Sequence, residues 1–400
     1  MTRTISPLPT RSPWSVLLDA DTPQACYVHV PFCRRRCHYC DFATGLGTAD
    51  LIDTYVQKLC LQIEQLPVSA VPLKTLFFGG GTPSLLHPDQ LDRITTALRS
   101  RFSFSEDLEF SLEANPGTVD RAKLAAYRDS GVNRVSLGVQ AFQAELLEAC
   151  GRLHGVEEVY RAVEDVRAAG FDDFNLDLIF GLPHQTREQW QTSLREVIAL
   201  HPAHISTYDL TIESETRFGR LYQPGDTPLP TDEATVQMYL EAIAQLTAAG
   251  YEHYEISNFA RPGHQCRHNR VYWENQSYFG LGMGAAGYIA RRRYLHPRTL
   301  NEYFQLVDCG HIPEPETRSP SEQMMDELMV GLRLREGIAL SHLEANYGGD
   351  RLQTVLNALA PHAERGWVSW TGDRLRLLPP EGWLFSNSVL VRAMHALDPD

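Results

Sequence analysis

The chain has 400 residues, enough for roughly two or three domains at about 150 residues each. Hydrophobic residues make up 43% and charged residues 22%, a globular composition that excludes a disordered, collagen-like or coiled-coil chain. The net charge of −14 disfavours nucleic acid as a partner, because an acidic protein repels phosphate backbones.

No segment of the sequence is typical of a membrane span or a secretory signal. The longest uncharged apolar stretch, Tyr278–Ala290, holds 13 residues, whereas a membrane-spanning helix needs about 20. The first 24 residues lack the apolar run of a signal peptide. We therefore expect a cytoplasmic protein, in which clustered cysteines indicate metal or redox chemistry rather than disulfides.

From residue 25 to 215, short β-branched or aromatic runs alternate with amphipathic, helix-length segments. The predicted strands are Ala25–Val30, Lys74–Phe78, Glu109–Glu113, Arg134–Gln140, Asp173–Ile179 and His204–Leu210. The helices predicted between them are Leu51–Leu66, Pro88–Arg101, Asp120–Ser130, Val156–Ala169 and Thr186–Leu200. This α/β alternation predicts parallel strands, and polar residues at the strand ends favour an incomplete (β/α)6 barrel, a partial TIM barrel, over an open doubly wound sheet.

The remainder of the chain changes character twice. Residues 216–320 are less regular and form a predicted barrel extension, with a helix at Thr231–Ala249. Residues 321–400 predict three helices and then a hairpin, which together suggest a small winged-helix-like α+β domain. Its elements are Ser321–Arg335, Ser341–Tyr347, Arg351–Arg365, Trp367–Trp370 and Arg374–Leu377. The predicted boundaries are thus 1–24 (N-terminal extension), 25–215 (barrel), 216–320 and 321–400.

Three cysteines, Cys33, Cys37 and Cys40, follow the first predicted strand in a C-x3-C-x2-C pattern. Thiolates at this spacing can bind three irons of a 4Fe–4S cluster, which leaves the fourth iron without a protein ligand. A small molecule can occupy such an open position, and we expect S-adenosylmethionine, a source of radical chemistry. The alternative is a zinc site in which His29 or His38 supplies the fourth ligand.

Further motifs follow the cysteines along the chain. They are Gly79-Gly80-Gly81-Thr82-Pro83-Ser84, Glu113-Ala-Asn115-Pro116, Arg134-Val-Ser-Leu-Gly-Val-Gln140, Gly151-Arg152-Leu-His154 and Asn175-Leu-Asp177-Leu-Ile-Phe-Gly181-Leu-Pro183. With the cysteines, they resemble the radical SAM superfamily, in the branch that holds oxygen-independent coproporphyrinogen III oxidase and the haem chaperone HemW. The resemblance extends from about Tyr27 into the C-terminal domain.

The resemblance implies which residues hold S-adenosylmethionine. They are Tyr27, Tyr39, Gly80, Gly81, Thr82, Glu113, Gln140, Arg152 and Asp177. These residue types suit the ligand, since glycines allow close approach of the backbone, carboxylates accept hydrogen bonds from hydroxyl and ammonium groups, and arginine pairs with a carboxylate. A solvated strand end is the alternative for any one residue, but their placement at successive strand ends favours a shared site.

A second candidate site is the segment Cys266-Arg-His268-Asn-Arg-Val-Tyr272-Trp273. His268 offers an axial haem ligand, with Cys266 as a weaker candidate, while Tyr272 and Trp273 offer flat apolar surface for a porphyrin. The pattern resembles the one associated with haem binding in this branch. A structural, hydrogen-bonding histidine is the equally weighted alternative for His268.

Two other patterns receive simpler interpretations. Gly282-Met-Gly284-Ala-Ala-Gly287 fits G-x-G-x-x-G but lacks the flanking strand and helix of a dinucleotide site, so we expect close packing there. The triplet Arg34–Arg36 is expected to be a solvated basic loop, with docking of an acidic electron donor such as a flavodoxin as the functional alternative.

Phe42 distinguishes the two functions of the branch. It stands where the oxidases have a further cysteine, and only 32 residues precede Cys33. Both features favour a chaperone that binds haem and passes it to respiratory haem proteins, with transient peripheral membrane contact and a cluster-dependent homodimer allowed by the resemblance. The alternatives are oxidative decarboxylation of coproporphyrinogen III and radical chemistry on another substrate.

Overall fold

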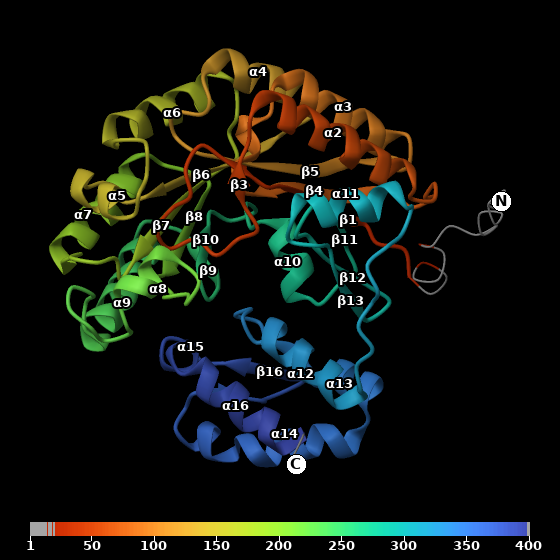
Figure 1. The fold of residues 1–400 in the computed structure, drawn as a ribbon. Coiled ribbons are helices and arrows are strands. Elements are labelled where there is room, and N and C mark those ends of the chain that lie inside the picture. The colour runs from red at the N-terminus through yellow and green to blue at the C-terminus, as the bar shows by residue number, and fades with distance from the viewer. Residues whose placement is uncertain (1–13, 15–17, 19–20, 398–400) are drawn as a thin grey trace.

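The computed structural model describes residues 14, 18 and 21–397, and a nine-stranded sheet forms its centre (Figure 1). The strands are β1 (Ala25–Val30), β4 (Leu73–Gly80), β5 (Phe104–Ala114), β6 (Arg134–Gln140), β7 (Phe174–Phe180), β8 (His204–Asp209), β9 (Glu252–Glu255), β10 (Asn258–Ala260) and β11 (Phe279–Leu281). Their order is β11-β1-β4-β5-β6-β7-β8-β10-β9.

The six predicted strands all form, and each pairs in parallel with the next along the chain. The predicted incomplete (β/α)6 barrel is therefore confirmed. Three strands were not predicted: β11 adds to β1 in parallel, and β10 and β9 extend the β8 edge antiparallel. They escape prediction because each has at most four residues, too few to show a period.

The helices cover the outer face of the curved sheet, as Figure 1 shows. They are α2 (Ala49–Glu64), α3 (Pro88–Arg99), α4 (Arg121–Asp129), α5 (Ala144–Ala149), α6 (Val156–Ala168), α7 (Arg187–Ala199) and α9 (Asp232–Ala248). α8 (Arg217–Leu221) instead contacts the segment that carries the cysteines, where the N–H of Phe218 donates to the His38 carbonyl at 2.8 Å. Capping residues fix several starts: the side chain of Thr48 accepts the N–H of Leu51, so α2 begins before the predicted position.

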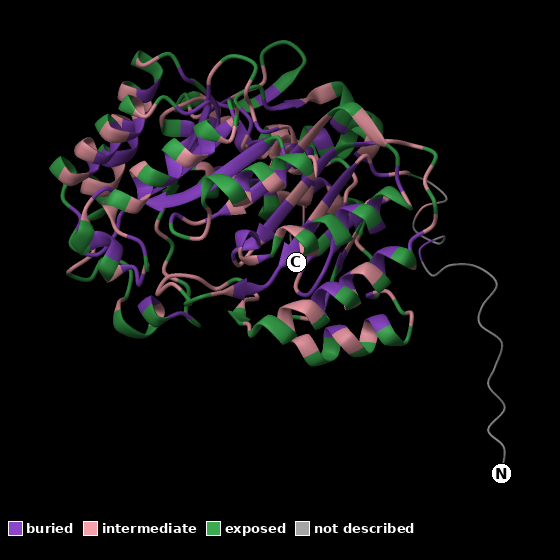
Figure 2. Ribbon diagram, turned by 90° about the horizontal axis from the view of Figure 1, so that it is seen from above, coloured by how far each residue is buried: buried purple, intermediate pink, exposed green. Residues whose placement is uncertain are grey.

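The strands are buried by this arrangement, and Figure 2 shows them purple beneath exposed helix surfaces. All seven residues of β6 are buried, as expected for a parallel strand covered on both faces. β5 begins at Phe104 rather than Glu109, because its first part is exposed and pairs with β4 only at Leu73 before the register shifts.

The C-terminal part follows the predicted winged-helix-like order and lies below the barrel in Figure 1. Its elements are α12 (Pro320–Gly331), β14 (Ile338–Ala339), α13 (Leu340–Tyr347), α14 (Gly349–Glu364), β15 (Val368–Ser369) and β16 (Arg374–Leu377). The strands form an antiparallel sheet in the order β14-β16-β15. Two further helices, α15 (Glu381–Leu384) and α16 (Ser386–Leu397), follow the hairpin.

Residues after α12 join the C-terminal part to the free edge of the large sheet. The N–H of Ile256 donates to the carbonyl of Arg333 at 3.2 Å, and the N–H of Arg335 donates to the carbonyl of Tyr254 at 3.0 Å. In the described part of the chain, no helix is both long and apolar enough to cross a membrane.

Candidate functional site

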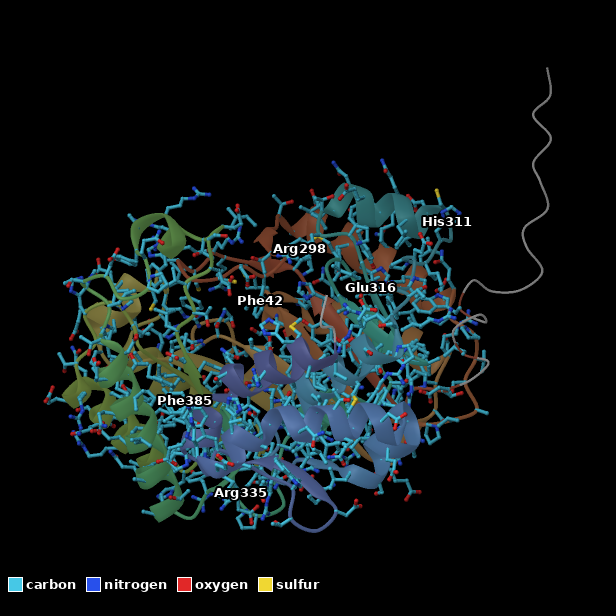
Figure 3. The ribbon with its side chains drawn as sticks, turned by 90° about the horizontal axis from the view of Figure 1, so that it is seen from below. Phe42, Arg298, His311, Glu316, Arg335 and Phe385 are labelled. Atoms are coloured by element: carbon cyan, nitrogen blue, oxygen red, sulfur yellow. The ribbon has the colours of Figure 1, made fainter. Side chains whose placement is uncertain are left out.

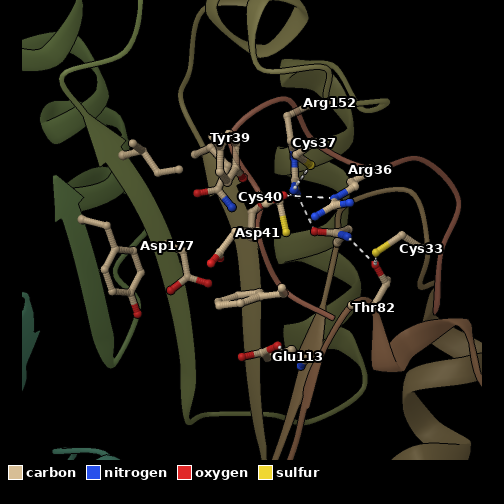
Figure 4. A pocket seen from close by; sticks show the side chains of 18 of the residues that line it. Cys33, Arg36, Cys37, Tyr39, Cys40, Asp41, Thr82, Glu113, Arg152 and Asp177 are labelled. Atoms are coloured by element: carbon tan, nitrogen blue, oxygen red, sulfur yellow. Dashed lines mark hydrogen bonds between the residues drawn. The ribbon is translucent and has the colours of Figure 1, made fainter. Parts of the chain in front are cut away.

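A cavity of about 490 Å³ lies at the carboxyl ends of the parallel strands (Figure 4). Its walls come from the cysteine loop and from the ends of β4 to β8. This is the end at which barrel enzymes place their chemistry. Of the nine residues predicted to hold S-adenosylmethionine, eight line this cavity, namely Tyr39, Gly80, Gly81, Thr82, Glu113, Gln140, Arg152 and Asp177.

Tyr27 is the residue that the structure places outside the cavity lining. Its hydroxyl lies 3.0 Å from Nδ1 of His29, and its ring stacks on Phe77 with the centroids 6.2 Å apart. In this arrangement Tyr27 supports β4 from the interior of the barrel.

The three cysteines line the cavity from one loop, which starts at β2 (Phe32–Cys33) and returns to pair at β3 (Gly45–Leu46). The Thr82 hydroxyl lies 3.7 Å from Sγ of Cys33, and Nη1 of Arg152 lies 3.4 Å from Sγ of Cys37. Burial raises the pKa of the Cys40 thiol to about 11 and also raises that of Cys33. A metal that takes these groups as thiolates must therefore displace protons.

The donor set fits an iron–sulfur cluster better than a zinc ion. Both ring nitrogens of His29 and of His38 already have partners, so neither histidine is free as a fourth zinc ligand. The partners are Tyr27 and the Ala43 carbonyl for His29, and the Ala149 carbonyl and Arg217 for His38. Across the described residues, no three His, Cys, Asp or Glu side chains converge on a single ion, whereas thiolates of a cluster each bind a different iron.

The glycine loop after β4 brings its backbone to the cavity wall. The N–H of Gly80 donates to Oε2 of Glu113 at 3.1 Å. Gly80 has φ +114°, and a Cβ there would lie 2.5 Å from the His29 ring. A side chain is therefore excluded at this position both by conformation and by space.

Two carboxyl groups, Glu113 and Asp177, face the cavity from β5 and β7, as Figure 4 shows. Burial, and then the charge of Asp177, raises the pKa of Glu113 to about 8. Burial also raises the pKa of Asp177. A ligand that brings a positive charge or hydroxyl donors would therefore stabilise the ionised forms of these two carboxyl groups.

Gln140 and Arg152 provide an acceptor oxygen and a positive charge at the cavity. Gln140 has φ +71°, and its buried Oε1 has no hydrogen-bond partner. Arg152 donates from Nη2 to the Gly138 carbonyl and to Oδ1 of Asn115, which ties the cysteine loop to the ends of β5 and β6. Gln140 can therefore accept a hydrogen bond from a ligand, and Arg152 brings positive charge to the same wall.

Sequence reasoning missed several lining residues. Asn115 lies within a motif already noted, and its Nδ2 donates to Oγ1 of Thr82 at 3.0 Å. Asp209 ends β8, and burial raises the pKa of its carboxyl to about 6. A search of every strand end for acidic residues would have found Asp209. Ser136 lies within the quoted motif that ends at Gln140, whereas Tyr208 belongs to no quoted motif.

Phe42 lies at the rim of the cavity with its side chain 61% exposed. It is near Arg298, whose Nη2 donates to the carbonyl of Asp41 at 2.6 Å (Figure 3). The aromatic ring therefore replaces the cysteine of the oxidase pattern without being packed into the core.

The predicted haem segment forms α10 (Arg267–Trp273), where His268 is completely buried. Its Nδ1 lies 2.8 Å from the Thr75 hydroxyl and its Nε2 lies 2.8 Å from the Tyr272 hydroxyl. Both ring nitrogens are thus occupied, so in this conformation His268 is the structural, hydrogen-bonding histidine of the alternative interpretation and offers no axial ligand. Trp273 packs under the Arg333 guanidinium at 4.5 Å.

The glycines of Gly282–Gly287 serve close packing, as expected. A Cβ on Gly282 would lie 2.4 Å from the Tyr55 hydroxyl, and one on Gly287 would lie 2.1 Å from the Tyr294 ring.

Comparisons with known proteins agree with one another. Residues 27–197 match the family described as the radical SAM superfamily, and residues 319–385 match the HemN C-terminal domain. The chain is 40% identical to the Heme chaperone HemW of Synechocystis sp., over 94% of this chain and 98% of that protein. It is 36% identical to the Heme chaperone HemW of Bacillus subtilis, over 92% and 98% respectively.

Among solved structures, coproporphyrinogen III oxidase (HemN) from Escherichia coli, which its title describes as a radical SAM enzyme, has the same fold. The TM-score is 0.80 at 25% identity, and the match covers 94% of this chain and 90% of that chain.

Proposed function

The chain belongs to the radical SAM superfamily, in the HemN and HemW branch, and on this basis we propose that it is a haem chaperone that binds a 4Fe–4S cluster and S-adenosylmethionine and delivers haem to respiratory haem proteins. The observation that carries the proposal is one cavity that brings together three cysteines and eight candidate cofactor residues. The full-length likeness to HemW proteins supports the chaperone over the oxidase.

Cys33, Cys37 and Cys40 would each hold one iron of the cluster. When bound, the cluster supplies an iron that can take S-adenosylmethionine and an electron for cleaving its sulfonium bond. The half-buried loop limits access of water to the thiols, and Nη1 of Arg152 lies 3.4 Å from Sγ of Cys37.

The remaining cavity residues would bind the organic part of the cofactor. Glu113, whose pKa is about 8, is suited to an ammonium group because a bound cation stabilises its ionised form. Asp177 and the free Oε1 of Gln140 can accept hydrogen bonds from ribose hydroxyls. Arg152 would pair with the cofactor carboxylate.

Haem binding requires a second surface. A cavity of about 490 Å³ has the size of a site for one drug-sized ligand, so we assign it to S-adenosylmethionine and place haem elsewhere. Tyr272 and Trp273 remain our candidates for contact with haem. His268 can serve as an axial ligand only after its hydrogen bonds to Thr75 and Tyr272 break.

Further partners are proposed from the charge of the cysteine loop and from the family. The exposed triplet Arg34–Arg36 would dock an acidic electron donor of the flavodoxin type. Peripheral membrane contact and a homodimer are compatible with delivery of haem to membrane-bound acceptors.

The likeness to coproporphyrinogen III oxidase favours one second candidate, which is oxidative decarboxylation of that porphyrinogen. Anaerobic cluster reconstitution, haem titration and a coproporphyrinogen assay on the same sample separate the two. The chaperone predicts stoichiometric haem binding without porphyrinogen turnover. Turnover that disappears in Cys37→Ala would establish the enzyme instead.

A further inference from the structure

A chain of buried polar side chains runs from the interior of the barrel toward the cavity and ends on Asp177. Ser136, Asn175 and His204 pair across β6, β7 and β8, so their side chains form one layer of the barrel interior. The three are 6%, 2% and 1% exposed. Asp177 lies two residues after Asn175 on the same face of β7, in the next layer toward the cavity.

The hydrogen bonds of Asn175 fix the orientation of its amide. Nδ2 donates to Oδ1 of Asp177 at 2.7 Å and to Oγ of Ser136 at 2.7 Å, and the Ser136 hydroxyl donates to Oδ2 of Asp177 at 3.2 Å. An ionised carboxylate can only accept hydrogen bonds, so the atom beside it must be the amide nitrogen. Oδ1 of Asn175 therefore points away from Asp177.

His204 supplies the shorter of two hydrogen bonds that hold this orientation. Its Nδ1 lies 2.7 Å from Oδ1 of Asn175, which can only accept, so Nδ1 carries the proton. The Ser206 hydroxyl donates to the same oxygen at 3.2 Å. Burial lowers the pKa of His204 well below its usual range, which leaves the ring neutral. Nε2 is then an acceptor, and the Tyr254 hydroxyl donates to it at 2.9 Å.

Every donor in this chain consequently points toward the cavity, from Tyr254 to His204, from His204 to Asn175, and from Asn175 to Asp177. We propose that His204 is a positioning residue that aligns Asp177, through Asn175, for the ribose hydroxyls of S-adenosylmethionine. The inference rests on the proposed function, since it assigns His204 a role in the same cofactor site. His204 itself does not line the cavity.

The test measures the affinity of the cluster-reconstituted full chain for S-adenosylmethionine by anaerobic titration calorimetry. His204→Phe removes the donor to Asn175, and we expect affinity to fall about tenfold, which corresponds to the loss of one oriented hydrogen bond. His204→Gln keeps an N–H donor and should recover affinity to within about threefold of wild type.

The matched control is His253→Phe, because His253 is also a buried histidine but bonds the Ile256 carbonyl and has no link to Asp177. Its affinity should stay within about twofold of wild type. Equal losses in both variants would overturn the proposal, since they would report general disturbance of the core.

A double-mutant cycle tests whether His204 acts through Asp177. If it does, adding His204→Phe to Asp177→Asn weakens binding by no more than about twofold further. A full additional tenfold loss would refute the assignment. If His204→Phe does not fold, Tyr254→Phe removes only the phenol donor, with a loss of about threefold expected and unchanged affinity as the contrary result.

Failure of the proposed function gives a different result from failure of this inference. If wild-type protein bound no S-adenosylmethionine, the proposed cofactor site itself would be refuted. If wild-type protein bound S-adenosylmethionine and His204→Phe bound it with unchanged affinity, only the positioning role of His204 would be refuted.

Discussion

The strand-end cavity and the α10 segment are both rich in polar and aromatic side chains, but they use their hydrogen-bonding groups differently. At the cavity, Oε1 of Gln140 has no partner and two carboxyl groups share a desolvated space. At the start of α10, the Glu109 carboxylate accepts the N–H groups of Arg267 and His268 at 2.8 and 2.9 Å.

The difference shows that chemical type alone does not mark a binding site. Unused acceptors and a raised carboxyl pKa indicate a surface built for a ligand, because burial of such groups is costly until the ligand arrives. Saturated groups, such as both nitrogens of His268, indicate a structural role. A ligand at His268 would have to replace hydrogen bonds that the protein already makes, whereas the buried Nε1 of Trp273 at the end of α10 has no partner among the described residues.

The largest expected effect is loss of metal at the cavity. Replacing Cys37 with alanine removes one of three thiolates and should lower the iron content after anaerobic reconstitution by about tenfold or more, since incomplete clusters are labile. Iron and sulfide analysis with the absorption spectrum measures this. Cys309→Ala is the matched control, because Cys309 is exposed at the end of α11 (Leu300–Asp308) and should leave iron unchanged. Equal iron in both variants would show that the loop does not hold the cluster.

The two hydrogen bonds of His268 predict a large cost of removing its side chain. His268→Ala leaves the Thr75 and Tyr272 hydroxyls unpaired and opens a cavity, so we expect about 3 kcal/mol less free energy of unfolding. Urea denaturation compares it with His311→Ala, an exposed position that should change stability by less than about 0.5 kcal/mol (Figure 3). Loss of haem affinity without loss of stability would instead support direct ligation.

The raised pKa of Glu113 predicts that the stability of the fold depends on pH. Its carboxyl pKa is raised from 4.5 to about 8 in the folded protein, so the protonated form contributes stability that is present below pH 4.5 and is lost as pH rises toward 8. Glu113→Gln removes this dependence.

The Glu113→Gln variant should therefore unfold at the same urea concentration as wild type near pH 4.5 and be more stable by about 4 kcal/mol at pH 8, because the buried charge is gone. Its affinity for S-adenosylmethionine should fall, since the amide cannot pair with an ammonium group. A stability difference independent of pH would show that Glu113 titrates normally.

The sequence alone predicts most of the cavity but little of the hydrogen bonding at α10. The barrel is predictable because six strands and their helices repeat one period, and strand ends meet at one edge. The cavity residues follow from that geometry. Asp209 was missed because no motif marks it, although it is an acidic residue at the end of β8, and Ser136 was missed although it lies within the motif that ends at Gln140.

The state of His268 could not be predicted in the same way. Its partner Thr75 lies on β4, far away in the chain, and only the folded barrel brings the two together. The same holds for Tyr27, which alternation places on the interior face of β1 but which the structure pairs with His29 rather than with the cavity. Local patterns report residue type, whereas hydrogen-bond saturation depends on tertiary contacts.

The smallest expected effect is at the rim. Phe42 is 61% exposed, so Phe42→Ser should change the free energy of unfolding by less than about 0.5 kcal/mol, measured by urea denaturation. Phe42→Cys restores the oxidase spacing, and we expect it to gain no coproporphyrinogen turnover, because the other residues that line the cavity stay the same. Turnover in Phe42→Cys would show that this one rim position separates the two functions of the branch. Destabilisation of more than about 1 kcal/mol in Phe42→Ser would show that the rim is packed. The cavity would then be less open than the contrast with α10 requires.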